Sequence, residues 1–380
     1  MKIGIDARTL INRRGIGNVV FHLLQGLSKI PYECSFVIYV DDFKSIELIP
    51  RDPRFSVKVL HPNIYPIWEQ IRLPISVMQD DLDILHCPGN SAPVFLPRRV
   101  KLVLSIMDVM FMFPSTQLPK SPSWYQRFGR KYLKYVVPIV AKRAAAITTI
   151  SSSSRNDITQ YIDVPLDSVI VIWLAANESC SITPDSSQLN AMRTSFQLNA
   201  PFVLALGALD PRKNTETILR SFVKFKQQHP SVIKLALVGL PSRGIEKFRR
   251  VADDLGIAND VVFAGFVTED DLVALYNAAE LLLYPSLYEG FGLPVLEAMI
   301  CGTPVITSSC GSIPEIAGDA ALMVDPHDED AIANALKMVL TNKIVYNSLV
   351  EKGKVRADLF SWQLAAEKIF AVYQSVMTAK

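Results

Sequence analysis

Residues 284 to 299 of this 380-residue chain read YPSLYEGFGLPVLEAM and contain the end of a strand, a loop and the start of a helix. The apolar run Leu281–Tyr284 predicts a buried strand. Gly290 and Gly292 let the backbone pass close to a ligand, and Pro294 suits the first position of a helix. A strand, a glycine-containing loop and a helix in this order are typical of a parallel sheet covered by helices.

Outward from this stretch, runs of Val, Ile and Leu alternate with helical patterns along nearly the whole chain, which predicts β-α-β units. In the first half the predicted strands are Lys2–Asp6, Ser35–Val40, Ser56–Leu60, Asp83–His86, Lys101–Ile106, Ala146–Ile150 and Ser168–Trp173. In the second half they are Phe202–Gly207, Lys234–Gly239, Val261–Ala264, Leu281–Tyr284, Thr303–Thr307 and Ala321–Val324. We therefore expect an α/β protein with two separate Rossmann-like, doubly wound parallel sheets.

The length of the chain also favours two domains. The polar segment 177–200 is interpreted as a linker between an N-terminal domain (1–176) and a C-terminal domain (201–358). The remaining residues, 359–380, predict a last helix with an apolar stripe that includes Trp362, Ile369 and Tyr373.

Composition excludes several classes of protein. With 49% hydrophobic and 20% charged residues, the chain is neither disordered, collagen-like nor a disulfide scaffold. Its five cysteines are widely spaced without a C-x-x-C pair, which argues against a metal knuckle and favours a reducing cytoplasm. No continuous apolar stretch of membrane-spanning length and no signal sequence are recognised, so we expect a cytoplasmic protein.

Charge is unevenly distributed: the net charge is +2, with +7 over residues 1–176 and −5 over residues 177–380. No nucleic-acid-binding module is recognised, and nucleic acid is not expected as a partner. Residues 124–143 stand out because they combine six cations with aromatic side chains and contain no acid. This segment predicts either a helix on an anionic membrane surface or a solvated helix whose aromatic residues pack inward.

Two acids flank the glycine loop quoted first. Free N–H groups at the start of the following helix suit a phosphate, which would repel a nearby carboxylate. Glu289 and Glu297 are therefore expected to accept hydrogen bonds from hydroxyl groups, Glu289 from a sugar ring and Glu297 from a ribose. The alternative is that both acids only stabilise the helix start through its dipole.

A phosphate, a sugar ring and a ribose together describe a nucleotide sugar. Two further stretches are predicted to contact this ligand. Arg212 and Lys213 follow the first strand of the second domain, where fixed cations would stabilise a departing diphosphate; otherwise they are solvated surface residues. Gly15 and Gly17 follow the first strand of the chain and could bring backbone amides to a phosphate, or form a tight turn without a ligand.

These motifs together resemble family 4 of the glycosyltransferases, which have the GT-B fold and retain the anomeric configuration of the sugar. The carriers are the two acids separated by seven residues (289 and 297), the turn Pro211–Asn214, the segment Gly311–Gly318 followed by 321–326, and the closing Phe360–Trp362. The resemblance covers nearly the whole chain. It implies transfer of a hexose from a nucleoside diphosphate sugar, bound mainly by the C-terminal domain, to an acceptor held by the N-terminal domain.

The same resemblance implies roles for individual residues. Glu297 matches the ribose-binding acid, Glu289 the acid at the donor sugar, and Lys213 the lysine at the diphosphate. The frequent arginine after the strand is Ala208 here, and Arg212 would take its place. The donor-binding residues are expected to be Gly15 and Gly17 together with Gly290, Phe291, Gly292 and Leu293 of the quoted loop.

One position departs from the family pattern. Many relatives have His-Asp after the strand Lys101–Ile106, whereas this chain has Met107-Asp108. Either Asp108 and the leaving phosphate suffice for catalysis, or activity is weak. His86 also ends a predicted strand, and it is expected on the acceptor side with Met107.

The sequence therefore predicts a retaining glycosyltransferase that acts on a glycan or a lipid-linked acceptor in cell-envelope or extracellular polysaccharide synthesis. The alternatives are a nucleotide-sugar 2-epimerase of the same fold and a catalytically weak sugar-nucleotide-binding protein. No Asp-x-Asp cluster ends a strand, so neither a metal nor another cofactor is expected besides the donor substrate.

Overall fold

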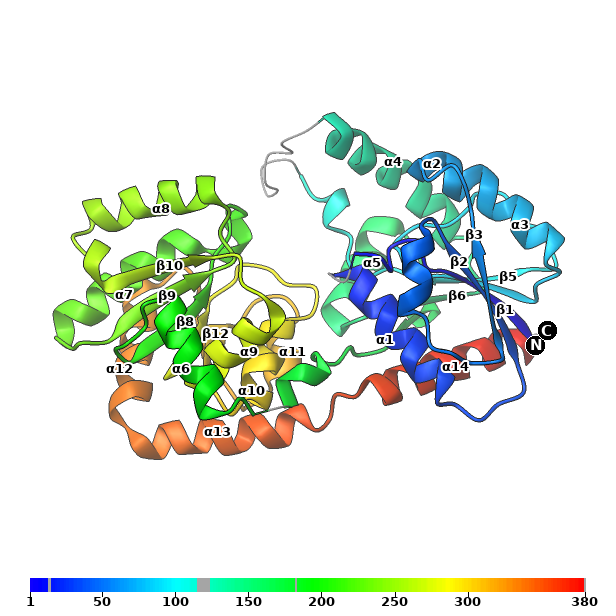
Figure 1. Cartoon of the computed structure of the whole chain (residues 1–380). Helices are drawn as coiled ribbons and strands as arrows, with labels where there is room; N and C mark the ends of the chain where they lie inside the picture. The colour runs from blue at the N-terminus through cyan, green and yellow to red at the C-terminus, as the bar shows by residue number, and fades with distance from the viewer. Residues whose placement is uncertain (13–14, 115–123, 182, 379–380) are drawn as a thin grey trace. The chain divides into compact units, whose positions relative to one another are not determined.

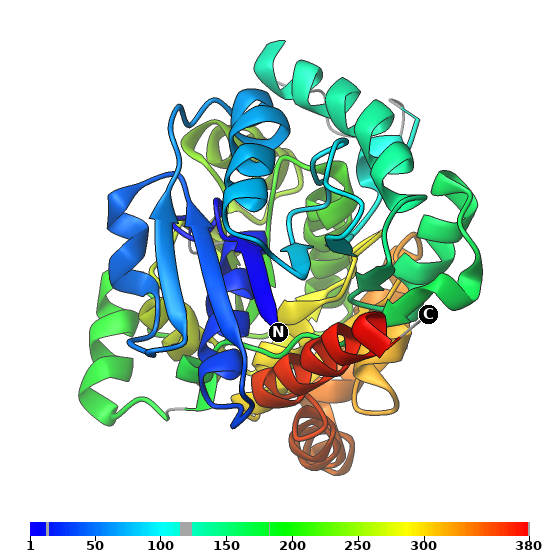
Figure 2. The same ribbon diagram turned by 90° about the vertical axis from the view of Figure 1, so that its right-hand side faces the viewer.

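The protein is described from a computed structural model covering residues 1–12, 15–114, 124–181 and 183–378 (Figure 1). These residues divide into two compact units: residues 1–114, 124–174 and 361–378 form the first, and residues from 175 to 360 form the second. Each unit contains one parallel sheet with helices on its faces (Figures 1 and 2). This confirms the predicted fold class.

The sheet of the first unit has seven strands in the order β3-β2-β1-β4-β5-β6-β7. Their bounds are β1 (Lys2–Asp6), β2 (Ser35–Val40), β3 (Phe55–Val59), β4 (Ile84–Cys87), β5 (Lys101–Ser105), β6 (Ala146–Thr149) and β7 (Val169–Val171). The helices are α1 (Ile16–Ser28), α2 (Tyr65–Ile67), α3 (Leu73–Gln79), α4 (Trp124–Ala141), α5 (Ser152–Ile162) and α14 (Trp362–Thr378). The π-helical turn η2 (Trp68–Arg72) joins α2 to α3 without a break.

The last helix, α14, packs on the first unit although it ends the chain (Figure 2). Trp362 stacks on His22 of α1 with ring centroids 4.5 Å apart. Gly26 of α1 allows the close approach, because a Cβ atom there would lie 2.4 Å from the Cβ of Ala366. The two helices therefore bury a continuous apolar face against each other.

The sheet of the second unit has six strands in the order β10-β9-β8-β11-β12-β13. The strands are β8 (Phe202–Leu206), β9 (Lys234–Val238), β10 (Val261–Gly265), β11 (Leu281–Tyr284), β12 (Val305–Ser308) and β13 (Leu322–Val324). The helices are α6 (Ser186–Ser195), α7 (Thr215–Gln228), α8 (Ser242–Asp254), α9 (Glu269–Ala278), α10 (Leu293–Ile300), α11 (Ile313–Ala317), α12 (Glu329–Thr341) and α13 (Lys343–Ala357).

Helix α6 lies inside the segment 177–200 that was interpreted as a linker. It begins with a capping box: the Asp185 carboxylate accepts from Gln188 N at 2.8 Å, and the Gln188 side chain accepts from Asp185 N at 2.9 Å. Because α6 is mostly polar, its apolar periodicity is weak, and the cap was the only local signal for a helix.

Both sheets change the direction of their strand order at one point, between β1 and β4 in the first unit and between β8 and β11 in the second. Loops that leave two such strands diverge to opposite faces of the sheet and leave a crevice at the carboxyl ends. None of the helices in the described residues combines the length and hydropathy needed to cross a bilayer.

Candidate active site

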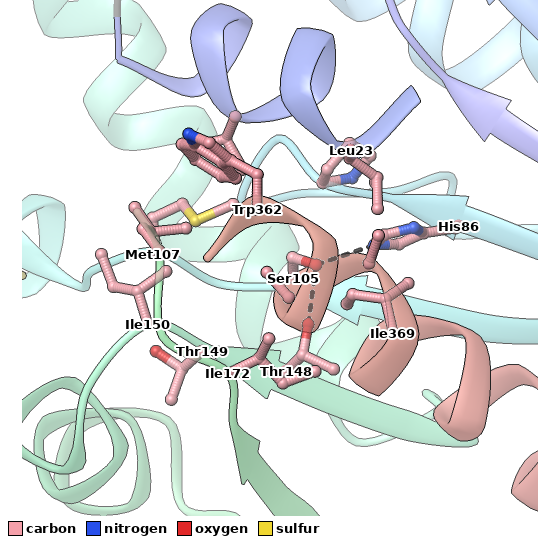
Figure 3. A pocket seen from close by; sticks show the side chains of 15 residues that line it. Leu23, His86, Ser105, Met107, Thr148, Thr149, Ile150, Ile172, Trp362 and Ile369 are labelled. Carbon is pink, nitrogen blue, oxygen red and sulfur yellow. Dashed lines mark hydrogen bonds between the residues drawn. The ribbon is translucent and has the colours of Figure 1, made fainter. Parts of the chain in front are cut away.

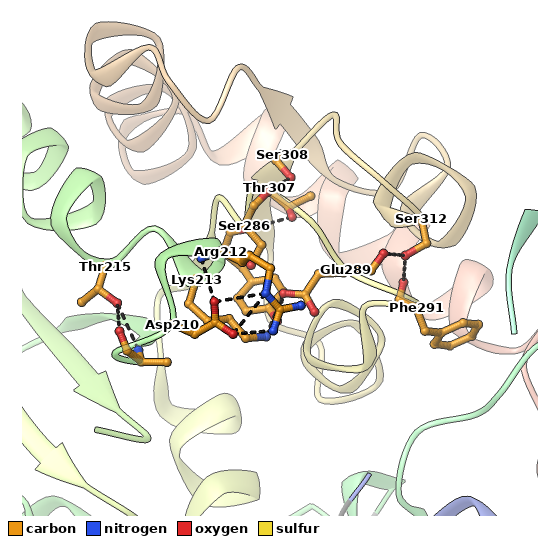
Figure 4. A network of polar contacts seen from close by, with 12 residues as sticks. Asp210, Arg212, Lys213, Thr215, Ser286, Glu289, Phe291, Thr307, Ser308 and Ser312 are labelled. Atoms are coloured by element: carbon orange, nitrogen blue, oxygen red, sulfur yellow. Dashed lines mark hydrogen bonds and ion pairs between the residues drawn. The ribbon is translucent and has the colours of Figure 1, made fainter. Parts of the chain in front are cut away.

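Lys213 and Glu289 meet at the carboxyl ends of β8 and β11 in the second unit (Figure 4). Lys213 Nζ lies 2.7 Å from Glu289 Oε1, and the hydroxyl of Tyr284 donates to the same oxygen at 2.7 Å. Lys213 Nζ also contacts the Tyr284 hydroxyl and lies 4.9 Å from the centre of that ring. The Glu289 Oε2 atom accepts no hydrogen bond from the described residues, so it can accept one from a ligand hydroxyl.

The turn that carries Lys213 is held by its own side chains. The 3-10 turn η6 (Pro211–Lys213) begins after Asp210, whose carboxylate accepts from Arg212 N at 3.0 Å and pairs with the Arg212 guanidinium. Asn214 then adopts a left-handed conformation (φ 57°) and donates to Pro285 O at 3.0 Å and to Pro326 O at 2.7 Å. Asn214 thereby ties the β8 turn to the loops after β11 and β13.

The loop that carries Glu289 is fixed from the other side by the turn after β12. Ser312 Oγ lies 2.9 Å from Glu289 O and 2.7 Å from Phe291 O, so its single proton is donated to one of these carbonyls or shared between them (Figure 4). Gly292 has φ 107°, and a Cβ atom there would lie 2.8 Å from Ile313 Cδ1. The left-handed backbone therefore favours glycine at this position, and a larger residue would also have to displace the end of the Ile313 side chain.

Glu297 lies one turn into α10 and contacts a different partner. Its Oε2 accepts a hydrogen bond from the Tyr276 hydroxyl at 3.0 Å. Burial raises the pKa of the Glu297 carboxyl, and the Tyr276 hydrogen bond opposes the rise. By accessible surface the side chain is half-buried, so its oxygens can also accept hydrogen bonds from a ligand, as from the hydroxyls of a ribose.

The other predicted donor-binding residues of this loop differ in what they present. Phe291 is buried and packs edge-on against Phe360, so its side chain belongs to the core and only its backbone can face a ligand. Gly290 and Leu293 are half-buried. Helix α10 begins at Leu293, so Pro294 is its second residue rather than its first.

Gly15 and Gly17 lie at the start of α1 in the first unit, where the backbone geometry favours glycine at both positions. Gly15 has φ 53° and precedes the first helical residue. A Cβ atom at Gly17 would lie 2.0 Å from Asn12 O and 2.3 Å from Thr9 O, so the preceding loop requires a glycine here. The two residues that precede Gly15, Arg13 and Arg14, lie outside the described residues.

Met107 and Asp108 follow β5, and their side chains have different environments. The Met107 side chain is buried and lines an apolar cavity of about 40 Å³ with Ile150 and Trp362 (Figure 3). Asp108 is half-buried and accepts from Met110 N at 3.0 Å. An apolar side chain at position 107 therefore suits the cavity that it faces.

His86 is a core residue, which corrects its predicted place on the acceptor side. It is fully buried, with Nδ1 2.6 Å from the Tyr373 hydroxyl. Its Nε2 lies 2.8 Å from Ser105 Oγ (Figure 3). Burial lowers the pKa of His86 to about 3, so the ring is neutral at physiological pH. Both ring nitrogens are used inside the unit, which leaves neither for a substrate.

Sequence reasoning missed Tyr284, Asp210 and Tyr276 as parts of the site. Tyr284 lies within the stretch quoted first, and Asp210 directly precedes the turn Pro211–Asn214. The signal for each was a polar group at the end of a buried strand or in the following turn. Tyr276 lies on α9, 21 residues before Glu297, and nothing local to its sequence indicates the contact.

Two family models match this chain: "Glycosyltransferase Family 4" over residues 13–177 and "Glycosyl transferases group 1" over residues 190–356. The chain belongs to glycosyltransferase family 4. The match covers both units and includes the second-unit turn and loop that bring Lys213 and Glu289 together.

Among curated proteins, this family 4 chain is 34% identical over 227 residues to the serotype-specific mannosyltransferase WbdA of Escherichia coli. That match covers 58% of the chain but only 28% of the relative, and the chain spans 28 to 30% of three such WbdA sequences. The O-antigen chain mannosyltransferase B of Escherichia coli is 28% identical, with 84% of this chain and 79% of that protein covered.

Solved structures share the GT-B fold with this family 4 chain. Sucrose-phosphate synthase from Thermosynechococcus elongatus has a TM-score of 0.74 at 20% identity, with both chains fully covered. HepE from Anabaena, solved with UDP and glucose, has a TM-score of 0.73 at 18% identity, with 99% of this chain and all of that chain covered.

Proposed function

We propose that the protein is a retaining hexosyltransferase that moves mannose from a nucleoside diphosphate donor to a glycan or lipid-linked acceptor in cell-envelope or extracellular polysaccharide synthesis. The names of the mannosyltransferase relatives support the sugar and the process. The observation that carries the proposal is the contact of Lys213 with Glu289, which sets a cation and a hydroxyl acceptor 2.7 Å apart at the ends of two neighbouring strands.

That pairing suits both parts of a nucleotide sugar. Lys213 neutralises Glu289, so a diphosphate can approach without facing an uncompensated carboxylate. As the bond between sugar and diphosphate breaks, negative charge grows on the diphosphate, and Lys213 with Arg212 stabilises it. Glu289 Oε2 holds a sugar hydroxyl, while Glu297 accepts from the ribose.

We propose that the acceptor attacks from the same face as the leaving group departs, with the leaving phosphate as the base. This route needs no base from the protein. It is therefore compatible with Met107, which cannot take a proton, in place of the histidine that many relatives have. It also needs no metal, since Lys213, Arg212 and backbone N–H groups supply the positive charge. Asp108 and the backbone at Gly15 and Gly17 are assigned to the reaction on the family resemblance alone.

We also propose that the acceptor is held at an anionic membrane surface, which α4 faces. Arg127, Lys131, Lys134, Phe128 and Tyr135 of this helix are exposed. Cations bind anionic headgroups, and aromatic rings favour the interface between lipid and water.

Transfer of labelled sugar tests the function. The protein is incubated with GDP-mannose, UDP-glucose, ADP-glucose or dTDP-glucose and a lipid extract of cell envelope, and the anomeric configuration of the product is measured by NMR. We expect label in a lipid-linked glycan, with the configuration of the donor retained. Glu289→Gln should abolish transfer, whereas Glu351→Gln on the exposed side of α13 should not.

Three outcomes would contradict the proposal. Epimerised donor without transfer would indicate the 2-epimerase, binding without turnover would indicate a sugar-nucleotide-binding protein, and an inverted product would exclude the same-face route.

A further inference from the structure

The helix formed by α2, η2 and α3 presents an apolar stripe to solvent. Ile64, Ile67, Ile71, Ile75 and Met78 follow one another at intervals of three or four residues, and each is between 37% and 55% exposed. Residues with this spacing lie on one face of a helix, and these five residues are called the isoleucine face. The opposite face is buried in the first unit through side chains such as Trp68, Leu73 and Val77.

Helix α4 carries a second exposed apolar stripe beside a row of cations. Phe128, Tyr135 and Ile139 are 51%, 75% and 49% exposed and share one face. Lys131 and Lys134 are exposed and, within the described residues, make no ion pair. Helix α4 contains no acidic residue.

A buried acid links the helix from α2 to α3 with α4 through a hydrogen bond. Glu69 of η2 is 1% exposed and accepts from the hydroxyl of Tyr132 on α4 and from Ser91 Oγ. Gln70 Nε2 donates to the Tyr132 hydroxyl at 2.7 Å, and the rings of Tyr65 and Tyr132 lie 5.3 Å apart. The only acid of residues 64–79 is therefore turned inward, so this outer face carries no exposed negative charge.

A connecting loop adds one more apolar side chain at the same place. Gln70 Oε1 accepts from Val94 N at 2.9 Å, and Arg143 donates to Val94 O. The next residue, Phe95, is 78% exposed. Figures 1 and 2 place α4 and the helix from α2 to α3 along the same side of the first unit.

We propose that this isoleucine face and α4 form one bilayer-docking surface, in which the apolar side chains enter the headgroup region of an anionic membrane and the cations bind lipid phosphates. The proposal rests on the membrane-associated acceptor of the proposed function and extends it to a second helix, which composition alone did not single out. A second copy of the chain is the other apolar occupant. Charge disfavours it, because a two-fold contact would bring the unpaired cations of both copies together without acids to meet them.

Flotation with lipid vesicles tests the surface. The full chain is mixed with phosphatidylcholine vesicles with and without phosphatidylglycerol, at low and at moderate salt. The variant Ile67→Ser, Ile71→Ser, Ile75→Ser is compared with the matched control Val232→Ser, Ile344→Ser, Val355→Ser, which changes three exposed apolar residues of the second unit. All three proteins are first checked for unchanged thermal unfolding.

We expect the isoleucine variant to bind anionic vesicles at least about tenfold more weakly at both salt concentrations, since apolar insertion is not screened. The control should bind like the wild type. Lys131→Gln with Lys134→Gln should weaken binding mainly at low salt, where the electrostatic attraction is strongest.

The surface is refuted if the wild type does not float with anionic vesicles or if the isoleucine variant floats equally well. It is also refuted if the wild type sediments as a dimer that the isoleucine variant converts to monomer. Transfer to a short water-soluble acceptor separates this proposal from the proposed function. If that transfer fails in every variant while flotation depends on the isoleucines, then the docking surface stands and the reaction assignment fails.

Discussion

At the scale of single residues, the site depends on charges that compensate one another before any ligand is bound. Lys213 is paired with Glu289, and Arg212 with Asp210. A substitution at any of these positions therefore changes its partner as well as itself.

Lys213→Ala should lower kcat about 100-fold or more while changing donor affinity less, because the charge that Lys213 stabilises grows in the transition state. Arg212→Ala should have a smaller effect in the same direction, since Asp210 engages the Arg212 guanidinium through both Nε and Nη2. Steady-state kinetics and calorimetry with the donor measure the two quantities, and Lys343→Ala on exposed α13 is the control. Unchanged kcat with a raised dissociation constant would mean that these cations only bind substrate.

Glu297→Ala should weaken binding of the nucleoside diphosphate by about 1–3 kcal/mol, because the ribose hydroxyls lose their acceptor in a partly buried pocket. Tyr276→Phe removes only the hydrogen bond to Glu297 and should weaken binding less. Isothermal calorimetry measures both. Equal affinity of Glu297→Ala and the wild type would leave this acid as a helix-stabilising residue.

Asp6, at the end of β1, should make the first unit less stable as pH rises. Burial raises the pKa of Asp6 to about 6, and Arg8 opposes the rise. The folded state then holds its proton at pH values where the unfolded state has lost it, so stability falls as pH increases from about 4 to above 6. Asp6→Asn should be more stable than the wild type at pH 7.5, by up to about 3 kcal/mol, and equal to it near pH 4.

Urea unfolding followed by tryptophan fluorescence measures this difference, because all four tryptophans of the chain (68, 124, 173 and 362) belong to the first unit. Asp167→Asn, at an exposed position, is the control and should show no such pH dependence. If the free energies of unfolding of the wild type and Asp6→Asn differ by the same amount at both pH values, the raised pKa of Asp6 is refuted.

At the scale of elements, the short turns after β8, β11 and β12 decide the geometry of the site. Asn214 and Ser312 join these turns through hydrogen bonds to backbone oxygens. Each turn leaves a buried strand, so its starting point is fixed by the sheet and only its own few residues can vary.

Gly292→Ala should disturb the loop before α10 and lower donor affinity. The left-handed backbone at Gly292 and the contact with Ile313 both disfavour a Cβ atom. Gly256→Ala is the matched control, because Gly256 also has positive φ (71°) but no atom near its would-be Cβ. We expect Gly256→Ala to cost about 1 kcal/mol of stability with normal donor binding, and Gly292→Ala to cost more and to impair binding. Similar donor affinities for both variants would show that the loop tolerates the change.

At the scale of the whole molecule, the chain builds its first unit from both of its ends. Residues 361–378 return to the sheet formed by residues 2–171, and the Tyr373 hydroxyl bonds His86 across 287 positions of sequence. The first unit is therefore complete only after the second has been made.

Tyr373→Phe should destabilise the first unit by about 1–3 kcal/mol, because it leaves a fully buried ring nitrogen of His86 without its partner. Tryptophan fluorescence in urea detects the loss. Donor binding by the second unit should be unchanged in calorimetry. Tyr346→Phe, on α13 of the second unit, is the control for the fluorescence signal. Equal unfolding of Tyr373→Phe and wild type would show that another group satisfies His86.

Local sequence alone determined the two sheets and the motifs at the carboxyl ends of their strands. Buried parallel strands are continuous apolar runs such as 281–284, and glycine, proline and polar residues must follow them where the chain turns. For this reason the positions of Lys213 and Glu289 on turns after their strands, and of Glu297 at the start of the next helix, could be predicted. The GT-B fold followed from the resemblance that these motifs carry together.

Only the tertiary structure decided which of these residues share a contact and which face the core. The partnership of Lys213 with Glu289 and Tyr284 arises because β8 and β11 are neighbours in the sheet although about 75 residues separate them. The burial of His86 and Phe291 likewise depends on helices and loops from distant parts of the chain. The exposure of the isoleucine face has the same cause: an apolar helix stripe reads as core from sequence, and only the packing of the rest of the unit shows that nothing within the described chain covers it.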